Sequence, residues 1–406
     1  MKGKMDKIEE VLTRGVDKIY PSAKALEKVL RSGKKIKLYQ GFDPSMENLH
    51  LGNMVGALKL KQFQDLGHEV IFLVGDFTGM IGDPTDKSST RPQLTRKQVL
   101  KNSKKWQSQA GKVLSFAGKN PAKIMFNSQW GDKITFKELI EITSNFTVQQ
   151  MLERDFFQRR LKKGKPIHLH EFLYPAAQAI DCVKMDVDLE IGGRDQTFNM
   201  LAGRTLMKAL KGKEKLVLTT RLLVDSKGEK VGKTTGNALF LNTSPDEMYG
   251  GIMSFPDEVI PLAFEMLTLI PLQSIKEKEK GLSSGKIHPM ELKKQLAFEI
   301  IKMYHGKKAA QKAQNYFSQV FQKRKLPATI KPIKINQAYV NIRHPVANIL
   351  FDLKLVPSKS ESKRLISQGA VELNNQKIKN PRLMMKLKEG DVFKVGKRTI
   401  RQVKIK

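Results

Sequence analysis

The first part of the chain alternates short apolar runs with longer segments of helical spacing. Residues 36–42 and 69–75 are short and mostly apolar, which predicts two buried strands. Between them, Met54 and Leu58 share one helical face, and Gly67 marks the expected end of that helix. A strand, a helix and a strand in this order predict a βαβ unit, and hence an α/β domain built on a parallel, doubly wound sheet.

More helices are predicted before residue 220. Thr95 and Gln98 are spaced as a capping box, which favours a helix that begins there. A Gly-Gly turn at residues 192–193 leads into another segment of helical spacing. The predicted helices cover residues 95–116, most of 136–163, 168–181 and the segment after the Gly-Gly turn.

The sequence changes character after about residue 240. Ser244 is placed to cap a helix that has Pro245 at its first position. Residues 289–305 carry apolar side chains every four residues, which predicts a long amphipathic helix. These signals predict an α-helical domain over residues 244–326, followed by a proline-containing linker over residues 327–343.

The last segment, residues 344–406, has a different composition again. Ser358 and Glu361 are spaced as a capping box, and two short strands flank a turn at Asn374 and Asn375. The segment holds 15 Lys or Arg residues against 5 Asp or Glu. This predicts a small α+β RNA-binding domain. The alternative, a solvated lysine-rich tail, fits less well because the segment also carries caps and apolar positions.

Overall charge points to the kind of partner. The chain holds 73 Lys and Arg against 40 Asp and Glu, a net charge of +33. An excess this large favours a polyanionic partner, nucleic acid first, although a general preference for lysine would raise the same number. The single cysteine, Cys182, excludes an intramolecular disulfide and a cysteine-based metal cluster. The chain has no membrane-length apolar run and no signal-peptide core, so we expect a cytoplasmic protein with no membrane partner.

Two polar loops follow the two predicted strands, and in doubly wound sheets ligands bind at that edge. The first loop leads into HLGN, where His50 at a helix start can donate to a phosphate and Gly52 permits close approach of a ligand. A simple helix cap is the alternative for His50. In the second loop, Asp83 suits an ammonium group, and Lys87 and Arg91 suit phosphate.

A third glycine-rich segment, GEKVGKTTGN, carries Lys230 and Lys233. It is not a phosphate-binding P-loop, because position 227 holds Lys227 where that motif needs glycine. A loop of this kind can close two ammonium groups over phosphates as charge develops on them. Taken alone, the segment fits a basic surface loop better.

One predicted helix has a single polar stripe. Tyr174, Gln178 and Asp181 are separated by four and three positions, so they share one face of an otherwise apolar segment. Such a stripe favours a lined pocket. Polar groups that are hydrogen-bonded within the core are the alternative.

These segments resemble one family when they are taken together and in order. HLGN is similar to the HIGH signature of class I aminoacyl-tRNA synthetases, and KVGKT is similar to their KMSKS signature. YQGFDPS, GDFTGMIGDPTDKSSTRP, FLYPAAQAID and GGRDQ resemble the bacterial tyrosyl-tRNA synthetases, and VPSKSESKRLISQGAVELNNQKI resembles the RNA-binding domain of ribosomal protein S-four. The chain departs from the signatures at Asn53, Gly232 and Thr234, and none of these changes removes a lysine.

The resemblance implies a domain plan and a set of partners. The activity would join L-tyrosine to ATP, releasing pyrophosphate, and then pass tyrosine to the terminal ribose of tRNA(Tyr). ATP would act as a substrate with Mg²⁺, with no tightly bound cofactor and no metal-ligating side chains. The insertion would carry a homodimer interface. The implied domains are a Rossmann-like catalytic domain at 1–226 with a helical insertion at about 95–200, a KMSKS-like loop at 227–243, an α-helical anticodon-binding domain at 244–326, the linker, and an S-four-like RNA-binding domain at 344–406.

The resemblance also implies a role for each site residue. Residues near the tyrosine would be Tyr39, Asp83, Tyr174, Gln178 and Asp181. Residues near the ATP or the adenylate would be Asp43, Ser45, Gly52, Gly192, Gly193, Asp195 and Gln196. The catalytic residues would be His50, Asn53, Lys87, Arg91, Lys230 and Lys233.

Two other hypotheses were weighed against this one. An RNA-binding protein on a catalytically silent scaffold would explain the basic C-terminal segment, but decay should have removed some of His50, Lys87, Lys230 and Lys233. The second hypothesis is an aminoacyl-tRNA synthetase for tryptophan, the nearest relative of the tyrosine enzymes in fold. Tyr39 and Asp181 argue against it, because an indole offers no phenolic oxygen.

Overall fold

The computed structural model describes residues 6–84, 93–224, 239–319, 330, 332–396 and 399–405. The chain divides into two compact units, Met1–Ser244 with Gly251–Lys307 and Pro245–Gly250 with Lys308–Lys406. Within the described ranges, no helix has the length and apolar character needed to cross a membrane.

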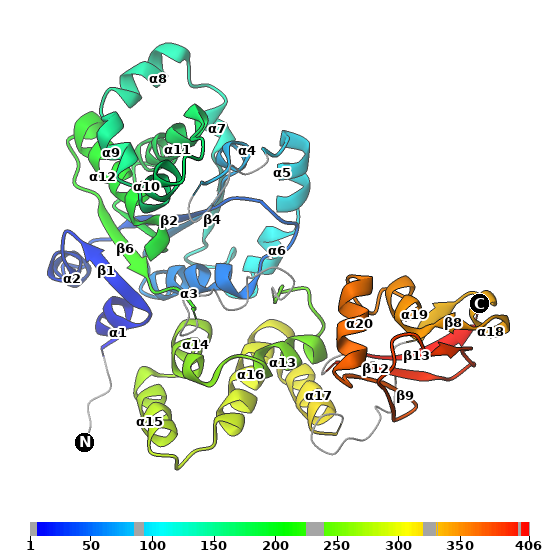
Figure 1. The fold of residues 1–406 in the computed structure, drawn as a ribbon. Helices are drawn as coiled ribbons and strands as arrows, with labels where there is room; N and C mark the ends of the chain where they lie inside the picture. The colour runs from blue at the N-terminus through cyan, green and yellow to red at the C-terminus, as the bar shows by residue number, and fades with distance from the viewer. Residues whose placement is uncertain are drawn as a thin grey trace. The chain divides into compact units, whose positions relative to one another are not determined.

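The first unit contains a six-stranded sheet (Figure 1) in the order β1-β6-β5-β2-β3-β4. The five strands from β6 to β4 are parallel, which confirms the predicted α/β class. The edge strand β1 was not predicted, and it pairs antiparallel with β6. The strands are β1 (Val16–Tyr20), β2 (Lys37–Phe42), β3 (Glu69–Val74), β4 (Lys123–Phe126), β5 (Leu189–Gly193) and β6 (Leu216–Thr220).

The order of the strands creates the place for a site. From β2 the chain runs outward through β3 and β4, and then returns to the other side of β2 to form β5 and β6. Parallel sheets bind ligands at such a switch point, beyond the carboxyl ends of the strands. In the β2–β5 pairing, Tyr39 lies directly opposite Glu190, so both side chains project from the same face of the sheet.

The helices of this unit confirm the predicted pattern, with shorter segments in two places. The range 95–116 forms two helices, because the chain turns after Ser103 and then buries Trp106. The range 136–163 forms three helices, and an unpredicted cap at Thr147 starts the second. The helices are α1 (Lys7–Thr13), α2 (Ala23–Arg31), α3 (Leu51–Asp65), α4 (Thr78–Ile81), α5 (Arg96–Ser103), α6 (Trp106–Ala110), α7 (Ser128–Gly131), α8 (Phe136–Thr143), α9 (Val148–Leu152), α10 (Asp155–Lys162), α11 (Leu169–Met185) and α12 (Thr197–Lys211).

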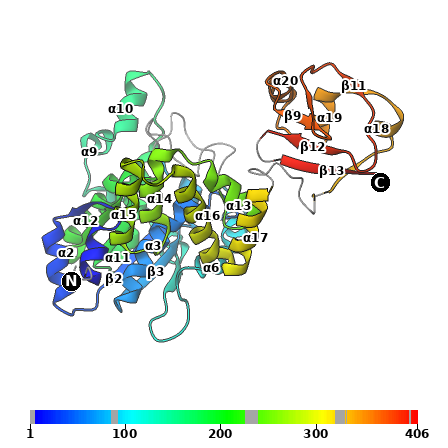
Figure 2. The same cartoon turned by 90° about the horizontal axis from the view of Figure 1, so that it is seen from below.

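One helix after residue 244, α14, packs beside α3 (Figures 1 and 2). The guanidinium group of Arg14, at the end of α1, donates to the backbone oxygens of Glu265, Thr268 and Ile270. These bonds satisfy carbonyl groups at the end of α14. The described helices between residues 244 and 319 are α13 (Pro245–Met253), α14 (Ile260–Leu267), α15 (Leu272–Ser283), α16 (Pro289–His305) and α17 (Lys307–Phe317).

The second unit contains a five-stranded sheet in the order β10-β9-β12-β13-β7. The predicted turn is confirmed, since Asn374 and Asn375 have φ of 48° and 66°, as a tight hairpin requires. The elements are β7 (Pro332–Ile335), α18 (Ala338–Asn341), β8 (His344–Pro345), α19 (Val346–Asp352), α20 (Lys359–Ser367), β9 (Val371–Leu373), β10 (Gln376–Ile378), β11 (Met384–Met385), β12 (Val392–Val395) and β13 (Thr399–Ile405).

Part of the segment expected to be a linker is regular structure. Residues 332–341 form β7 and α18, and β7 pairs in parallel with β13. Pro332 begins an edge strand, a position where a missing amide hydrogen is tolerated. Ile335 is buried in the core of this sheet, which explains why the strand docks.

Candidate active site

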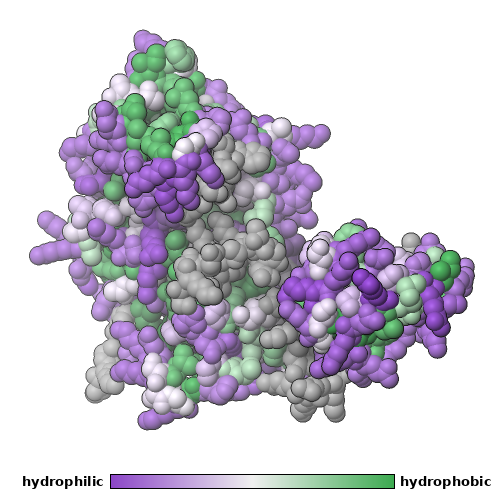
Figure 3. Space-filling view, viewed as in Figure 1, coloured by the Kyte–Doolittle hydropathy of each residue, from purple (hydrophilic) through white to green (hydrophobic). Residues whose placement is uncertain are grey.

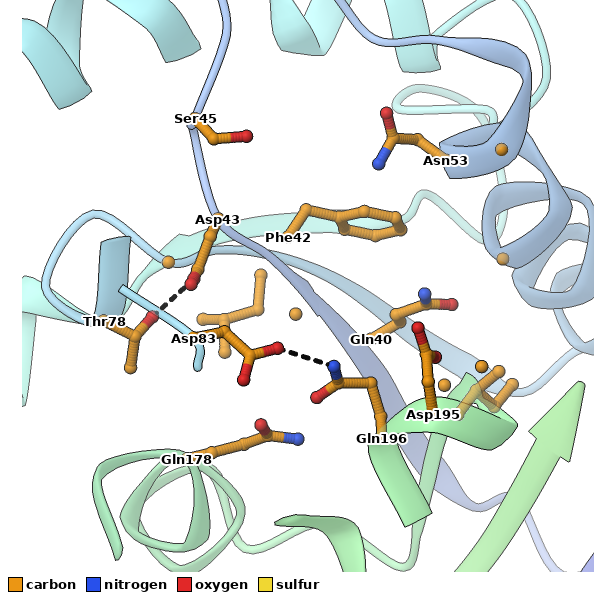
Figure 4. Close-up of a pocket in the computed structure, with 18 of the residues that line it drawn as sticks. Gln40, Phe42, Asp43, Ser45, Asn53, Thr78, Asp83, Gln178, Asp195 and Gln196 are labelled. Carbon is orange, nitrogen blue, oxygen red and sulfur yellow. Dashed lines mark hydrogen bonds between the residues drawn. The ribbon is translucent and has the colours of Figure 1, made fainter. Parts of the chain in front are cut away.

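A cavity of about 600 Å³ opens at the carboxyl ends of β2, β3, β5 and β6 (Figure 4). It is lined by every predicted site residue that the structure describes, and their individual roles stay predictions. These residues are Tyr39, Asp43, Ser45, His50, Gly52, Asn53, Asp83, Tyr174, Gln178, Asp181, Gly192, Gly193, Asp195 and Gln196. Lys87, Arg91, Lys230 and Lys233 lie outside the described residues. Below, Tyr39, Gln178 and Asp181 are called the floor, and His50, Gly52 and Asn53 the rim.

The floor contains a buried hydroxyl group. Tyr39 is 0% exposed, and its hydroxyl makes no hydrogen bond of good geometry with a described residue, although the carboxyl group of Glu190 lies near it. Burial, together with the charge of Glu190 nearby, raises the pKa of Tyr39 well above its ordinary value, so the phenol keeps its proton. A buried hydroxyl without a partner is unfavourable. This side chain is therefore suited to a polar group of a ligand.

Asp181 is the acceptor on the floor, and two donors hold it. Trp130 Nε1 donates to Oδ1 at 2.8 Å, and Asn127 Nδ2 donates to Oδ2 at 3.1 Å. Burial raises the pKa of Asp181 well above its ordinary value, while these two bonds lower it. Two carboxylate oxygens have about four acceptor sites, so the group can accept a further bond from a ligand. Sequence reasoning missed Asn127 and Trp130, which follow the unpredicted strand β4.

A second network fixes Asp43 beside the floor. The Tyr174 hydroxyl donates to Asp43 Oδ2 and the Thr78 hydroxyl donates to Oδ1, both at 2.7 Å. Asn127 Nδ2 also donates to the Thr78 hydroxyl at 3.0 Å, which joins this network to Asp181. A Cβ atom at Gly75 would lie 2.1 Å from Asp43 Oδ1, so the network needs glycine there.

Asp83 is the carboxylate of the second loop. Gln196 Nε2 donates to its Oδ2 at 2.7 Å (Figure 4), and Arg154 Nη2 lies 3.9 Å from its Oδ1. Burial lowers the pKa of Arg154 to about 10, although the carboxylate of Asp83 opposes that shift. The guanidinium group also stacks over the ring of Phe156, at 4.3 Å from its centre. The arrangement fixes the carboxyl group of Asp83 in the cavity wall.

The rim is the N-terminus of α3. His50 is the N-cap: its Nδ1 accepts from Asn53 N at 3.3 Å, and Asn53 Oδ1 accepts from His50 N at 3.0 Å. The cap hypothesis for His50 is therefore confirmed, and the same ring also lines the cavity. With Nδ1 as acceptor, the neutral ring carries its proton on Nε2, as a donor. A Cβ atom at Gly52 would lie 3.0 Å from the His50 ring, so glycine makes room for that ring.

Other lining residues have a local explanation. A Cβ atom at Gly193 would lie 2.5 Å from Asp195 Oδ1, so the glycine lets this carboxylate fold back at the end of β5. Trp106 also lines the cavity, is 3% exposed, and has no partner for its indole N–H among the described residues. Trp106 was not predicted as a site residue, because the sequence predicts one continuous helix over residues 95–116 and nothing in that pattern distinguishes position 106.

Over the described ranges, no group of three or more His, Cys, Asp or Glu side chains is placed to hold a metal ion.

Comparison with known families defines the class. Residues 31–322 match the family model described as tRNA synthetases class I (W and Y), and residues 345–393 match the S4 domain. The fold, the cavity at the switch point and these matches define a class I aminoacyl-tRNA synthetase with a C-terminal S4 RNA-binding domain.

Similar sequences show which amino acid the family of this chain uses. The chain is 42% identical over 397 residues to the tyrosine–tRNA ligase of Carboxydothermus hydrogenoformans, covering 96% of this chain and 95% of the relative. It is 41% identical to the enzyme of Moorella thermoacetica, covering 96% and 93%. It therefore belongs to the tyrosine–tRNA ligase family of aminoacyl-tRNA synthetases. These relatives favour the tyrosine hypothesis over the tryptophan alternative.

Solved structures agree with this fold. The C-terminally truncated mitochondrial tyrosyl-tRNA synthetase of Coccidioides posadasii superposes with a TM-score of 0.62 at 25% identity, over 77% of this chain and 92% of that one. The corresponding Aspergillus nidulans structure gives a TM-score of 0.65 at 23% identity, over 78% and 95%.

Proposed function

We propose that the cavity binds L-tyrosine with its phenol on the floor, between Tyr39 and Asp181. The observation that carries this assignment is the buried Tyr39 hydroxyl, which lacks a partner among the described residues beside a carboxylate held by two donors. A phenol supplies both a donor for Asp181 and an acceptor for Tyr39. Phenylalanine supplies neither, and would leave these buried groups unpaired.

The amine of the substrate is assigned to Asp83, Tyr174 and Gln178. An ammonium group has three donors and no acceptor, so it needs oxygen atoms around it. Asp83 supplies a carboxylate on one wall of the cavity, and Tyr174 and Gln178 reach in from α11. The hydrogen bond from Gln196 to Asp83 supports this geometry by holding the carboxylate in place.

ATP is assigned to the rim and the ends of β2 and β5. The N-terminus of α3 favours negative charge, and the Nε2–H group of His50 can donate to a phosphate. Asp43, Ser45, Gly192, Gly193 and Asp195 would complete the adenylate site, together with the second donor of the rim, Asn53. Mg²⁺ bound to the ATP phosphates would neutralise part of their charge.

The first reaction needs no nucleophile from the protein. A carboxylate oxygen of tyrosine forms a bond to the α-phosphorus of ATP while the bond from that phosphorus to the bridging oxygen breaks, and pyrophosphate leaves with the electron pair. The protein contributes orientation and charge stabilisation. We assign the stabilisation of pyrophosphate to Lys87, Arg91, Lys230 and Lys233, as the family signatures suggest.

The second reaction transfers tyrosine to the terminal ribose of tRNA(Tyr), and we propose that the S4 domain helps to hold that tRNA. Removal of the domain should leave adenylate formation within about 3-fold and weaken tRNA charging about 100-fold, through lost phosphate contacts. Since β7 pairs with β13, the cut should fall before Pro332, for example by deleting residues 320–406. Equal loss of both activities would count against this division of roles.

A homodimer through the predicted insertion is also proposed. Phe136 and Ile140 are four residues apart on α8 and are 78% and 54% exposed, and Val148 and Leu169 lie exposed in the same insertion. Figure 3 shows hydrophobic residues gathered over α8. An apolar surface of this kind favours a protein partner. Light scattering should give twice the mass of the chain, and F136E/I140E should give the mass of one chain. A monomeric wild type would contradict the proposal.

The proposed location is the cytoplasm, because tRNA(Tyr) and ATP are cytoplasmic substrates. Fractionation of cells that produce a tagged chain would test it. Recovery of the protein in the membrane fraction would argue against it.

Tyrosine-dependent ATP–pyrophosphate exchange on the purified full chain tests the main proposal. Exchange with tyrosine, and much less with phenylalanine or tryptophan, is the expected result. A folded protein that binds tRNA but exchanges with none of the three amino acids would favour the catalytically silent scaffold.

A further inference from the structure

A buried ion pair lies behind the cavity floor. Lys215, just before β6, donates through Nζ to Oε2 of Glu190, and also to the carbonyl of Met200 at 3.1 Å. Lys215 is 0% exposed and Glu190 is 1% exposed. Buried ion pairs are costly to form and frequently add nothing to stability. A pair in this position, next to a binding cavity, therefore invites a functional explanation.

The ion pair is joined to the cavity through Gln178. Gln178 Nε2 donates to Oε1 of Glu190 at 2.9 Å. Gln178 extends from α11 toward the space in front of Asp83 and Gln196 (Figure 4). An ionised carboxylate only accepts hydrogen bonds, so Glu190 selects the nitrogen end of the amide. The oxygen end of Gln178 is then the end that a ligand meets.

The surroundings are shaped to keep Lys215 in place. A Cβ atom at Gly203, in the middle of α12, would lie 2.7 Å from Lys215 Nζ and 3.1 Å from the Cys182 sulfur. Glycine in a helix interior is unfavourable relative to alanine, so this glycine has a packing reason. Burial lowers the pKa of Lys215, and Cys182 and Glu190 raise it by more, so the ammonium group stays charged.

We propose that Glu190 and Lys215 are positioning residues that hold the amide oxygen of Gln178 toward the ammonium group of the amino acid. Lys215 holds one oxygen of Glu190, the other oxygen orients Gln178, and Gln178 presents an acceptor where the substrate has only donors. The pair thereby selects for a substrate that carries the amine. This inference rests on the proposed function, because it takes the cavity as the tyrosine site.

The most direct test is E190Q. While Lys215 stays charged, the new amide at position 190 turns its oxygen to the ammonium group of Lys215 and its nitrogen to Gln178. Gln178 must then turn its own oxygen to that nitrogen, which leaves the nitrogen of Gln178 facing the substrate. Dissociation constants are measured by calorimetry on the full chain, for L-tyrosine and for 3-(4-hydroxyphenyl)propanoate, which is the same molecule without the amine. E190Q should weaken tyrosine at least 10-fold and the analogue less than 2-fold.

Two further variants separate orientation from packing. In E190Q/K215M the ammonium group is absent, the new amide can accept from Gln178, and tyrosine affinity should return to within about 3-fold of the wild type. G203A moves Lys215 without removing a charge, and should weaken tyrosine more than the analogue. The matched control is K59M. Lys59 is a buried lysine outside the cavity lining that donates to the carbonyls of Val11 and Arg14, and its loss should leave the ratio of the two constants unchanged.

The possible outcomes are distinct. Equal weakening of both ligands in E190Q, with a lowered melting temperature, would show a packing role and overturn the inference. An unchanged ratio in folded E190Q and G203A would overturn it as well. A wild type that binds the analogue as tightly as tyrosine would overturn the amine assignment in the proposed function, and this result involves no variant.

Discussion

The floor and the rim of the cavity are built from different kinds of contact. On the floor, Asp181 is held by Asn127 and Trp130, which lie 54 and 51 positions away in the chain. On the rim, His50 and Asn53 hold each other across three positions. The floor therefore depends on the packing of several elements, whereas the rim forms as soon as α3 is capped. Substitutions on the floor should act on recognition through a network, and substitutions on the rim should stay local.

The largest effect is expected on the floor, from D181A. The variant removes the acceptor for the substrate phenol. It also leaves the N–H groups of Asn127 and Trp130 without their acceptor. The lost hydrogen bond contributes about 1 kcal/mol and the buried phenol left without an acceptor costs about 1–3 kcal/mol more, so kcat/KM for tyrosine-dependent exchange should fall roughly 30- to 1000-fold. Steady-state exchange at several tyrosine concentrations measures this. A loss below 10-fold would remove Asp181 from phenol recognition.

On the rim, two substitutions of His50 separate its two roles. H50A removes both the cap and the ring donor, so it should lower the unfolding free energy by about 0.5–2 kcal/mol and kcat for exchange about 100-fold. H50N keeps a good cap, so it should retain stability and still lose activity. Urea unfolding and exchange are measured together. Full activity in H50N would show that His50 serves only as a cap.

Y39F should have two smaller effects of opposite sign, a gain in stability and a loss of discrimination between amino acids. The variant deletes a buried hydroxyl that has no partner among the described residues, so the unliganded protein should become more stable, by about 1 kcal/mol. Discrimination of tyrosine from phenylalanine should fall about 10-fold, because one hydrogen bond to the phenol is lost. Thermal unfolding and exchange with both amino acids check this. A less stable Y39F would mean that the hydroxyl already has a good partner.

The most gradual effect concerns pH. Burial raises the pKa of Asp181 in the folded protein, so the folded state keeps a proton over a pH range in which the unfolded chain has lost it. Stability is therefore lost as pH rises from the unfolded pKa toward the folded pKa, by at most about 1.4 kcal/mol per pH unit. D181N should lack this contribution. Urea unfolding at intervals between pH 4 and 8 compares the two slopes, and identical slopes would argue against a raised pKa.

The same contrast decides how much the sequence could predict. The rim lies in four consecutive residues, HLGN, and its cap involves only neighbours in the chain, so its position and the cap could be predicted. On the floor, Tyr39 and Asp181 were predicted because the strand and the helix that carry them have clear patterns and resemble the family. Their supporting partners, Asn127 and Trp130, follow β4, whose four residues are too few to show a clear periodic pattern, although Asn120 and Pro121 mark a turn just before it.

Other features were missed for related reasons. Glu190 and Lys215 come from β5 and from the residue before β6, and a charged residue inside an apolar strand gives no sign of its partner 25 positions away. The edge strand β1 alternates poorly, with Asp17 and Lys18 in its centre, so its pairing depends on β6 rather than on its own pattern. The sequence predicts a linker where β7 forms, because the strand that β7 pairs with, β13, lies about 70 positions away in the chain.

The most direct measurement is a crystal structure of the protein with L-tyrosine. The account predicts that the substrate phenol oxygen lies within hydrogen-bonding distance of both the Tyr39 hydroxyl and the Asp181 carboxylate, with the ammonium group beside the Gln178 amide oxygen. A phenol bound elsewhere in the cavity, with the Tyr39 hydroxyl still unpaired, would contradict it.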